Sequence, residues 1–550
     1  MIDWSGRLVR YPAEFVRRYR EAGVWGTAPI ATEFQRVAAA AADRVAVVGD
    51  EGALSYAELD EQAARLALGL ADLGLRPGDR VILQITNQLQ SVVIWYGLLK
   101  AGLIPVCTLA AHRGHEIGGI SRKVGAVAHV VEAAGSRFDF VAFAVEQQVG
   151  HPTLRHVLAA GAPDPRAVSI AELIDSADAA RAHAVVAEIQ SQIDPDEIAA
   201  FQVSGGTTGI PKVIPRLHAE YWHNGHAFAR RSGWTRDTRV AHIIPIIHNA
   251  GIAQALNAVH SVGGTLVLGN ADLDRALGVL ARERATDVLI GHGHYGMIDH
   301  PLFGEAMASM RRVVLSGAKV PQRVFDAFES RGVWVGQNFG MGEGMCFLSP
   351  PDAPAAGRLT TVGVPVSRLD EFRVVEPGTE VDVADGDVGE LICRGPYTIR
   401  GYFDAPDINP GAFTSDGFYR TGDLVSVRVF GGDRCMAVEG RIKNLISRGG
   451  EKISPDEVEY LLVQHPRIVA AAVVAMPDAR LGERACAYLV ADGEPLTMEQ
   501  VQEHLGRLQV AKFKWPERLE YLDALPKTPI GKLDKKVLER DVAAKLATTG

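Results

Sequence analysis

The first hundred residues alternate amphipathic segments with short apolar runs. Ser55, followed three residues later by Glu58, forms a capping-box pattern, which predicts a helix that runs through Ala63 to Leu73. The next expected elements are a strand at residues 80–84, a helix at 90–101 and a strand at 104–109. Because helix and strand alternate along the chain, we expect an α/β fold.

Patterns typical of helices and strands also occur near the two ends of the chain. Phe15, Val16 and Tyr19 lie at helical spacing, which predicts an amphipathic helix at residues 12–26 with Pro12 in its first turn. Near the C-terminus the pattern predicts a separate small α/β unit: a helix from Pro455 to His465, strands at 469–475 and 484–490, and a helix from Thr497.

Composition limits the class of protein. The chain has 550 residues, 47% of them hydrophobic, so it is long enough for more than one compact core. A net charge of −9 with both signs interspersed argues against nucleic acid as a main partner. The five cysteines lack the spacing of a zinc site or a disulfide framework, which favours a reducing cytoplasm. No apolar run of about 18 residues is present, and the polar N-terminus does not resemble a signal peptide, so no membrane segment is expected.

The stretch Ser-Gly-Gly-Thr-Thr-Gly-Ile-Pro-Lys, from Ser204 to Lys212, is the richest candidate for chemistry. Its glycines let backbone N–H groups approach an anion, while the hydroxyls and the lysine add donors and charge, which suits a polyphosphate. It is not a Walker loop, because a proline and a lysine follow its last glycine. On composition alone, a flexible surface loop is an equally good interpretation.

This stretch resembles the phosphate loop of the acyl-adenylate-forming superfamily. Six motifs of that superfamily appear in order across residues 203–536, and the resemblance is strongest to stand-alone aryl acid:AMP ligases of siderophore and nonribosomal peptide biosynthesis, which activate salicylate or 2,3-dihydroxybenzoate. The resemblance implies a large adenylation domain at residues 1–442, made of β-sheets with packed helices plus a small β-barrel-like part. A small, mobile C-terminal α/β domain is implied at residues 443–550.

The resemblance also assigns an ATP site. Asp423 would accept both ribose hydroxyls and Glu343 would bind Mg²⁺, tasks that suit the two oxygens of a carboxylate. Outside this series of motifs, Asp423 would be an ordinary turn residue and Phe339 a core aromatic. The expected ATP-binding residues are Ser204, Gly205, Gly206, Thr207, Thr208, Lys212, Gly317, Ala318, Asn338, Phe339, Gly340, Met341, Asp423 and Arg441.

A second set of residues concerns the acid. An apolar strand from Ala241 is predicted to end at His248 and Asn249. A histidine at a strand end is more often a hydrogen-bonded core residue, but in the aryl-acid branch His-Asn borders the acyl pocket, where the amide would bond an ortho substituent. The chain departs from this branch at Ala250, where an aromatic is usual, and at Gly342, where Ala or Thr is usual. Both changes predict a roomier, less polar pocket and put dihydroxybenzoate in doubt.

The small domain carries the remaining expectations. Lys532, in Pro-Lys-Thr-Pro-Ile-Gly-Lys, matches the family's catalytic lysine, which contacts the carboxylate and the α-phosphate; without the motif it would be solvated surface charge. The resemblance makes Lys443 a hinge. Rotation about Lys443 would bring a thiolation loop to the incoming thiol. The loop consists of Arg448, Gly449, Gly450, Glu451 and Lys452.

The sequence therefore predicts a ligase that uses ATP and Mg²⁺ to convert a 2-hydroxyaryl acid of salicylate type to an aryl-AMP. The aryl group would then pass to the phosphopantetheine thiol of an aryl carrier protein. The nearest alternative is an aryl-CoA ligase that uses free CoA and accepts a methylated or bicyclic acid. A luciferase-like oxidation and a non-catalytic nucleotide sensor are weaker alternatives; loss of Lys532, Asp423 or Glu343 would have indicated a sensor, and all three are present.

Overall fold

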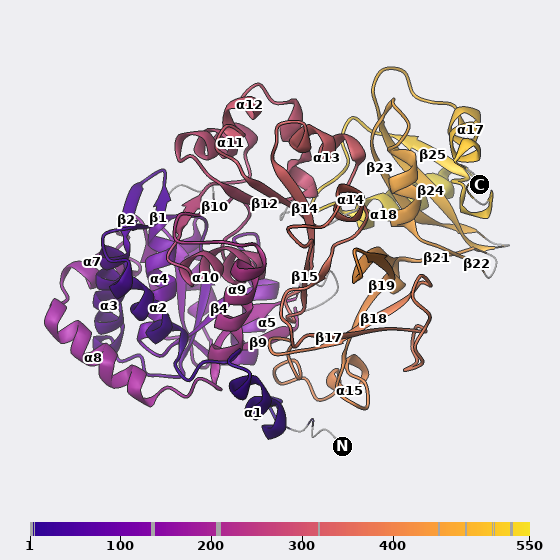
Figure 1. The fold of residues 1–550 in the computed structure, drawn as a ribbon. Helices are drawn as coiled ribbons and strands as arrows, with labels where there is room; N and C mark the ends of the chain where they lie inside the picture. Colours follow the sequence, from indigo (N-terminus) through magenta and orange to yellow (C-terminus); the bar gives the residue numbers. More distant parts are fainter. Residues whose placement is uncertain are drawn as a thin grey trace.

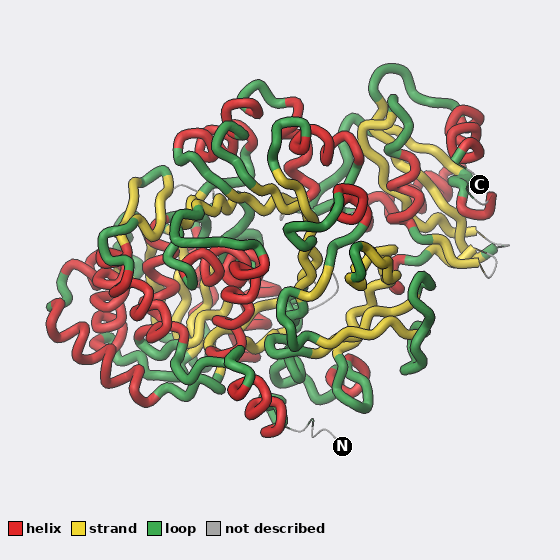
Figure 2. Tube along the Cα trace, viewed as in Figure 1, coloured by secondary structure: helices red, strands yellow, loops and turns green. Residues whose placement is uncertain are grey.

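The computed structural model describes residues 4, 6–133, 138–204, 211–316, 320–448, 451–478, 481–508, 510, 512–528 and 532–549. A large N-terminal part is followed by a small C-terminal part (Figure 1), and both consist of sheets flanked by helices (Figure 2). The predicted α/β fold with a large and a small part is confirmed.

Two mostly parallel sheets form the core of the large part. The first has the strand order β16-β15-β14-β13-β12-β10-β11-β1-β2 and the second β7-β6-β5-β3-β4-β8-β9. Strands of the second sheet read as apolar runs because helices cover both faces, and every residue of β5 is buried. The first sheet comprises β1 (Val45–Gly49), β2 (Gly52–Ser55), β10 (Arg239–His242), β11 (Thr265–Leu268), β12 (Asp287–Gly291), β13 (Arg312–Ser316), β14 (Trp334–Gly340), β15 (Cys346–Leu348) and β16 (Val364–Pro365). The second comprises β3 (Arg80–Gln84), β4 (Ile104–Cys107), β5 (Ala126–Glu132), β6 (His156–Ala160), β7 (Val168–Ser169), β8 (Ile198–Val203) and β9 (Val213–Leu217).

Helices pack on these sheets and between them. The predicted capping box is present at the start of α3, where Ser55 and Glu58 satisfy each other's backbone N–H groups. The helices of the large part are α1 (Ala13–Glu21), α2 (Ile30–Ala40), α3 (Tyr56–Asp72), α4 (Leu89–Lys100), α5 (Gly114–Val124), α6 (Phe140–Gln148), α7 (Ile170–Asp175), α8 (Ala179–Gln192), α9 (His218–Arg231), α10 (Asn257–His260), α11 (Leu273–Arg282), α12 (Phe303–Ala306), α13 (Gln322–Glu329), α14 (Ala355–Thr360) and α15 (Asn409–Ala412), with a π-helix at Ala250–Leu256 and a 3₁₀ helix at His292–Asp299.

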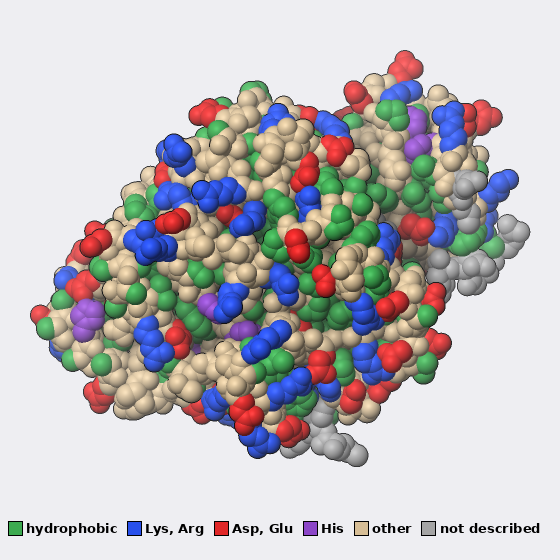
Figure 3. Space-filling view, in the orientation of Figure 1, with side chains coloured by type: hydrophobic (Ala, Val, Ile, Leu, Met, Phe, Trp, Pro, Cys, Tyr) green, Lys and Arg blue, Asp and Glu red, His purple; other side chains and the backbone are tan. Residues whose placement is uncertain are grey.

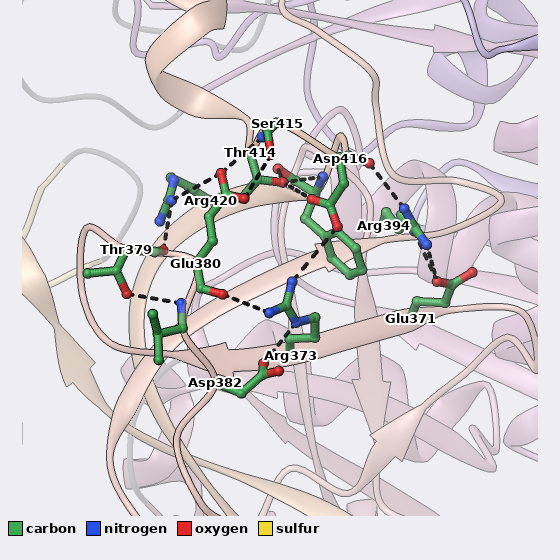
Figure 4. Close-up of polar contacts among 12 residues, drawn as sticks. Glu371, Arg373, Thr379, Glu380, Asp382, Arg394, Thr414, Ser415, Asp416 and Arg420 are labelled. Atoms are coloured by element: carbon green, nitrogen blue, oxygen red, sulfur yellow. Dashed lines mark hydrogen bonds and ion pairs between the residues drawn. The ribbon is translucent and has the colours of Figure 1, made fainter. Parts of the chain in front are cut away.

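An antiparallel sheet completes the large part and corresponds to the predicted barrel-like region. Its strands, in spatial order, are β17 (Glu371–Val375), β18 (Gly389–Arg394), β19 (Tyr419–Phe430) and β20 (Asp433–Arg441). Ion pairs and hydrogen bonds tie its connecting loops to the strands (Figure 4), including Arg373 to Asp382 at 2.8 Å, and Arg394 pairs with Glu371 of the neighbouring strand at 2.7 Å. Exposed pairs of this kind contribute little each, so the network orders the loops more than it stabilises the fold.

The small part is built on a sheet that packs against α16 and α18. Its strands are β21 (Ile446–Arg448), β22 (Glu451–Ile453), β23 (Ile468–Asp478), β24 (Gly482–Ala491) and β25 (Arg518–Tyr521); its helices are α16 (Pro455–Leu462), α17 (Met498–Arg507) and α18 (Lys535–Thr549), with 3₁₀ turns at Ile442–Asn444 and Lys512–Lys514. The predicted order helix, strand, strand, helix is therefore confirmed. Ser454 Oγ donates to the carbonyl oxygen of Glu439 in β20 at 2.7 Å and so joins the two parts.

Two predicted elements are shorter than expected. The leading helix ends at Glu21 rather than at residue 26, because Gly23 adopts a left-handed conformation with φ 69° and terminates it. The strand that begins near Ala241 ends at His242 and does not reach residue 249. Pro245 lies in the segment where the strand was expected to continue, and a proline cannot donate a hydrogen bond to a sheet.

Other sequence expectations concern the surface and the cysteines. The face in Figure 3 carries acidic and basic side chains interspersed with one another. All five cysteines are buried and unbridged. Among the described helices, none has the length and apolar character needed to cross a membrane.

Asp370, which directly precedes β17, has a buried carboxyl group whose protonation affects the stability of the fold. One of its oxygens accepts from the Tyr397 hydroxyl at 2.5 Å and from the Ser367 N–H at 3.1 Å, and the other is buried without a partner. Burial raises the pKa of Asp370 to about 8, whereas the carboxyl in an unfolded chain titrates near about 3.9. The native state thus binds a proton that the unfolded state does not, and the resulting stabilisation is full below about pH 4 and lost as the pH rises through about 8.

We therefore expect Asp370→Asn, which mimics the protonated acid, to melt near the parent temperature at about pH 4. At about pH 9 the variant should melt several degrees above the parent, because a buried charge then destabilises the parent alone. Thermal unfolding followed across this pH range checks the prediction, and a difference that stays constant with pH would contradict it.

Candidate active site

The predicted phosphate loop connects two antiparallel strands. β8 and β9 pair antiparallel, with Val203 opposite Val213. Ser204 N–H donates to the Lys212 carbonyl oxygen at 2.9 Å, and Ser204 Oγ accepts from the Lys212 N–H at 3.0 Å, which joins the two ends of the predicted loop. An antiparallel strand rather than a helix follows the predicted loop, so this is not the Walker arrangement, as expected. The predicted residues Gly205, Gly206, Thr207 and Thr208 lie outside the described residues.

Tyr402 links the lysine of this loop to the predicted Mg²⁺ ligand. Its hydroxyl donates to Glu343 Oε1 at 2.6 Å and lies 2.9 Å from the hydroxyl of Tyr419, while the Lys212 ammonium sits 4.6 Å from the centre of its ring. Burial, together with the negative charge of Glu343, raises the pKa of Tyr402, so the phenol stays protonated as a donor. The structure therefore brings Lys212 to the ring face of Tyr402 and Glu343 to its hydroxyl group.

Asp423 and Arg441 face each other across β19 and β20. Arg441 Nε donates to Asp423 Oδ1 at 2.6 Å, and the two residues are paired in the sheet register. Desolvation raises the pKa of Asp423, although the guanidinium opposes that rise. The carboxylate is 3% exposed, whereas the Arg441 side chain is 47% exposed, so this pair lies at the edge of the sheet with its cation toward solvent.

Lys532 stands at the end of a small hairpin of the C-terminal part. An isolated bridge pairs Lys527 with Leu533, and the Thr528 hydroxyl accepts from the Lys532 N–H at 3.2 Å. The Lys532 side chain reaches solvent, but the surrounding protein lowers its pKa, and the nearby charge of Arg441 lowers it further. The surrounding protein lowers the pKa of His248 to about 4 although its side chain reaches solvent, and the charge of Lys532 contributes to that shift. Lys532 therefore lies close to the predicted acid pocket and to the predicted ribose site at once.

His248 and Asn249 precede the π-helix Ala250–Leu256 rather than ending a strand. The Asn249 amide is buried and fully engaged with protein on its oxygen side: Oδ1 accepts from Arg216 Nη1 at 2.8 Å and from the Tyr221 hydroxyl at 3.1 Å. Its nitrogen donates to the carbonyl oxygen of Met341 at 3.1 Å. The acid pocket and the loop of Glu343 are thus joined by hydrogen bonds.

Asn338 is suited to the expected contact with adenine. It is 4% exposed, and its amide nitrogen donates to Gln254 Oε1 at 3.0 Å. Its amide oxygen is buried without a partner, and an exocyclic amino group would satisfy that acceptor. Phe339 and Gly340 follow it at the end of β14, with Met341 in the next turn. The predicted residues Gly317 and Ala318 lie outside the described residues.

The space left by Gly342 is not open, so the expectation that this glycine enlarges the pocket is wrong. A Cβ at position 342 would lie 2.8 Å from Cδ1 of Ile214, which is fully buried in β9. The isoleucine already fills the place of the missing methyl group. Ala250 and Gln254 do line an internal cavity of about 20 Å³, shared with Val314 and Leu348, which is room for about one water molecule or a methyl group.

Arg448, a described residue of the predicted thiolation loop, contacts the small part of the chain. Arg448 pairs with Glu517 of the small part at 2.8 Å, and no contact among the described residues links Arg448 to the ATP-side residues. Gly449 and Gly450 lie outside the described residues, as do the side chains of Glu451 and Lys452. Lys443, the expected hinge, is exposed in the 3₁₀ turn that joins the two parts.

Sequence reasoning missed the residues that hold the predicted site in place. No role was predicted for Tyr402, Arg216, Tyr221 or Gln254. A signal for Arg216 existed: a charged residue within the apolar strand Val213–Leu217, followed four positions later by Glu220, indicates a buried ion pair.

The comparisons with known proteins agree with this geometry. The model of the AMP-binding enzyme family matches residues 34–403, and that of the AMP-binding enzyme C-terminal domain matches residues 457–532. The chain belongs to the AMP-binding enzyme family. The predictions of superfamily membership and of a ligase-type enzyme are confirmed.

Individual relatives cover nearly the whole length of this AMP-binding enzyme. The salicyl-AMP ligase / salicyl-S-ArCP synthetase of Mycobacterium tuberculosis is 37% identical, over 98% of this chain and 95% of its own. A salicylyl-CoA synthase / salicylate adenylyltransferase of a Streptomyces species is also 37% identical, over 97% of both chains. Among solved structures, the apo structure of MbtA from Mycobacterium smegmatis is 35% identical with a TM-score of 0.73, covering 97% of this chain and 98% of MbtA.

Tyr402→Phe tests whether the Tyr402 hydroxyl positions Glu343. The substitution keeps the ring beneath Lys212 and removes a hydrogen bond to a carboxylate, an interaction of about 1.5–3 kcal/mol. We expect the KM for MgATP to rise by about tenfold or more with little change in the KM for the acid, measured by exchange of pyrophosphate into ATP. Tyr419→Phe is the matched control. It should have the smaller effect, because in the parent the Tyr419 hydroxyl contacts Tyr402 and does not donate to Glu343. A similar rise of both KM values in Tyr402→Phe would contradict this role.

Proposed function

We propose that this enzyme adenylates an aromatic carboxylic acid with ATP and then passes the aryl group to a thiol. The observation that carries the proposal is the position of Lys532, whose charge acts on His248 of the acid side and is itself affected by Arg441 of the ribose side. An ammonium between the two substrate sites is where charge must be offset as a carboxylate joins the α-phosphate.

The proposed acid is of the 2-hydroxyaryl, salicylate type. The pair His248-Asn249 supports an aryl acid with an ortho substituent, and relatives that cover nearly the whole chain are named for salicylate. Because these relatives carry salicylate in their names, we favour salicylate or a methylsalicylate over a bicyclic acid.

Adenylation proceeds by in-line attack of the acid's carboxylate oxygen on the α-phosphorus, with pyrophosphate as the leaving group. The chain's contribution is to align the two substrates and to offset charge, which needs no covalent enzyme intermediate. Lys532 would contact the carboxylate and the α-phosphate, and Lys212 would hold the leaving pyrophosphate. The surrounding protein lowers the pKa of His248 and keeps it neutral near pH 7, so it adds no charge that would compete with Lys532 for the carboxylate.

Mg²⁺ fits the residues present. The described residues contain no group of three or more His, Cys, Asp or Glu side chains that would hold a metal unaided. One carboxylate together with phosphate oxygens and water is, however, a common set of ligands for Mg²⁺ in nucleotide sites. Glu343 would hold the ion, Tyr402 orients that carboxylate, and the bound ion would neutralise charge on the phosphates.

For the second half-reaction we propose an aryl carrier protein as acceptor in the cytoplasm, with free CoA as the alternative. The pairing of Arg448 with Glu517, away from Lys532, supports two arrangements of the small part, with Lys443 as the pivot. Pyrophosphate must leave before a thiol enters, so a change of arrangement between the half-reactions is chemically reasonable.

The acid is tested by ATP–pyrophosphate exchange across benzoate, salicylate, methylsalicylates, picolinate and hydroxynaphthoates. We expect strong exchange with salicylate and methylsalicylates and weak exchange with hydroxynaphthoates. Exchange with aliphatic or amino acids alone would overturn the aryl assignment.

The thiol acceptor is tested by supplying either CoA or a phosphopantetheinylated aryl carrier protein to the enzyme with its activated acid. Faster loading of CoA would favour the alternative.

Lys532→Ala separates the two half-reactions. Because Lys532 would act only while the acid meets the α-phosphate, we expect adenylation to fall by about a hundredfold or more. Thioester formation from supplied aryl-adenylate should stay within about threefold of the parent, since that step does not use this contact. Each half-reaction is measured by single-turnover kinetics, and an equal loss in both would contradict the role of Lys532.

A further inference from the structure

Arg216 is a charged residue in an otherwise apolar strand. All of β9 is buried, and the Arg216 side chain is 0% exposed. It forms a two-pronged ion pair with Glu220 in the first turn of α9, from Nε to Oε1 at 2.9 Å and from Nη2 to Oε2 at 2.8 Å. A buried pair is tolerated when its remaining donors are also satisfied, so the other contacts of this guanidinium matter.

The remaining N–H groups of Arg216 reach several separate segments of the large part. Its partners besides Glu220 are Asn249 Oδ1 at 2.8 Å, the Gly342 carbonyl oxygen at 3.2 Å, Asn224 Oδ1 at 3.2 Å and the Tyr397 carbonyl oxygen at 3.4 Å. All five donors of the planar fork therefore have acceptors. Two of these acceptors, Asn249 and Gly342, belong to the predicted acid site.

The contacts of Asn249 fix which way its amide faces. Arg216 can only donate, so the amide atom that contacts it must be the oxygen. The Met341 carbonyl can only accept, so the atom opposite it must be the nitrogen. Turning the amide over would break both bonds and the one from Tyr221.

Tyr221 strengthens this constraint. Gln202 Nε2 donates to the Tyr221 hydroxyl at 3.0 Å and also lies 3.4 Å from the carbonyl oxygen of Ile247, which can only accept. The Tyr221 oxygen is therefore an acceptor toward Gln202 and directs its own proton to Asn249 Oδ1 at 3.1 Å. Both acceptor positions of the Asn249 oxygen are then taken, and the amide keeps one unused hydrogen-bonding group, its second N–H.

We propose that Arg216 is a positioning residue that locks Asn249 as a hydrogen-bond donor, so that the pocket selects aryl acids whose ortho group accepts a hydrogen bond. This inference rests on the proposed function. The phenol oxygen of salicylate can accept from Asn249 while its own proton bonds the neighbouring carboxylate. The amino group of anthranilate has its lone pair delocalised into the ring and would set N–H against N–H, which leaves a buried donor unpaired.

The test compares salicylate with anthranilate, which differ by one hydroxyl and one amino group. In the parent enzyme, ATP–pyrophosphate exchange should favour salicylate in kcat/KM by at least about a hundredfold. Arg216→Lys keeps the charge beside Glu220 but replaces the fork by a point donor, so it weakens one of the three bonds that oppose turning of the Asn249 amide. We expect this ratio to fall by about tenfold, with the KM for MgATP within about threefold of the parent.

Two further variants distinguish positioning from general damage. Arg358→Lys changes another buried arginine, which pairs with Glu329 at 2.7 Å in a different part of the fold, and should lower the melting temperature without altering the acid ratio. Tyr221→Phe removes one of the two donors to Asn249 without disturbing the ion pair and should shift the ratio in the same direction by about threefold. It therefore tests the inference even when Arg216→Lys folds poorly.

The outcomes separate the inference from the proposed function. A parent enzyme that activates both acids equally, or an acid ratio that is unchanged in Arg216→Lys and Tyr221→Phe while both rates fall together, would overturn the role of Arg216 and leave aryl adenylation intact. A parent enzyme that activates no aryl acid at all would instead overturn the proposed function, and the inference with it.

Discussion

The buried ion pair between Arg216 and Glu220 is the interaction on which the site depends. Burying two charges is costly, and removing one partner of such a pair typically destabilises a protein by about 3–5 kcal/mol. The chain uses the pair to join β9, the first turn of α9, the segment before the π-helix and the turn that carries Glu343. The proposed acid pocket and Glu343, the proposed Mg²⁺ ligand, therefore share one support.

A second constraint acts across the two parts of the chain. The small part delivers Lys532 to the edge of the large part, where charges from Arg441 and the desolvating surroundings act on it. The same small part keeps Arg448 paired with its own Glu517. This arrangement of the two parts places the proposed adenylation lysine near Arg441 while Arg448 is paired within the small part, which is consistent with the proposed reaction, whose two steps need different neighbours.

Local patterns in the sequence predict local structure well. The start of α3 follows from Ser55 and Glu58, and the strands and helices of the small part follow from their apolar spacing. The motif series also places residues together that lie far apart in the chain, such as Asp423 and Lys532 near Arg441. The first of these successes concerns features that a short stretch of sequence encodes by itself, and the second depends on the resemblance of the motif series to a known family.

Most of the errors and omissions share one physical cause: contacts between distant segments are not encoded by the spacing of residues along the chain. Gly342 looks like open space until Ile214, 128 positions earlier, is found against it. Tyr402 is 59 positions from the Glu343 that it orients, and Asn249 is 33 positions from Arg216. The early end of β10 is a different case, because Pro245 was visible in the sequence and its missing N–H was given too little weight.

The most direct test of this account is a high-resolution structure of the enzyme bound to a stable analogue of salicyl-adenylate. We predict that the phenol oxygen lies within about 3.2 Å of Asn249 Nδ2, while Oδ1 stays bonded to Arg216 and Tyr221. A phenol oxygen bound by another side chain, or an Asn249 amide turned so that its oxygen faces the acid, would contradict it.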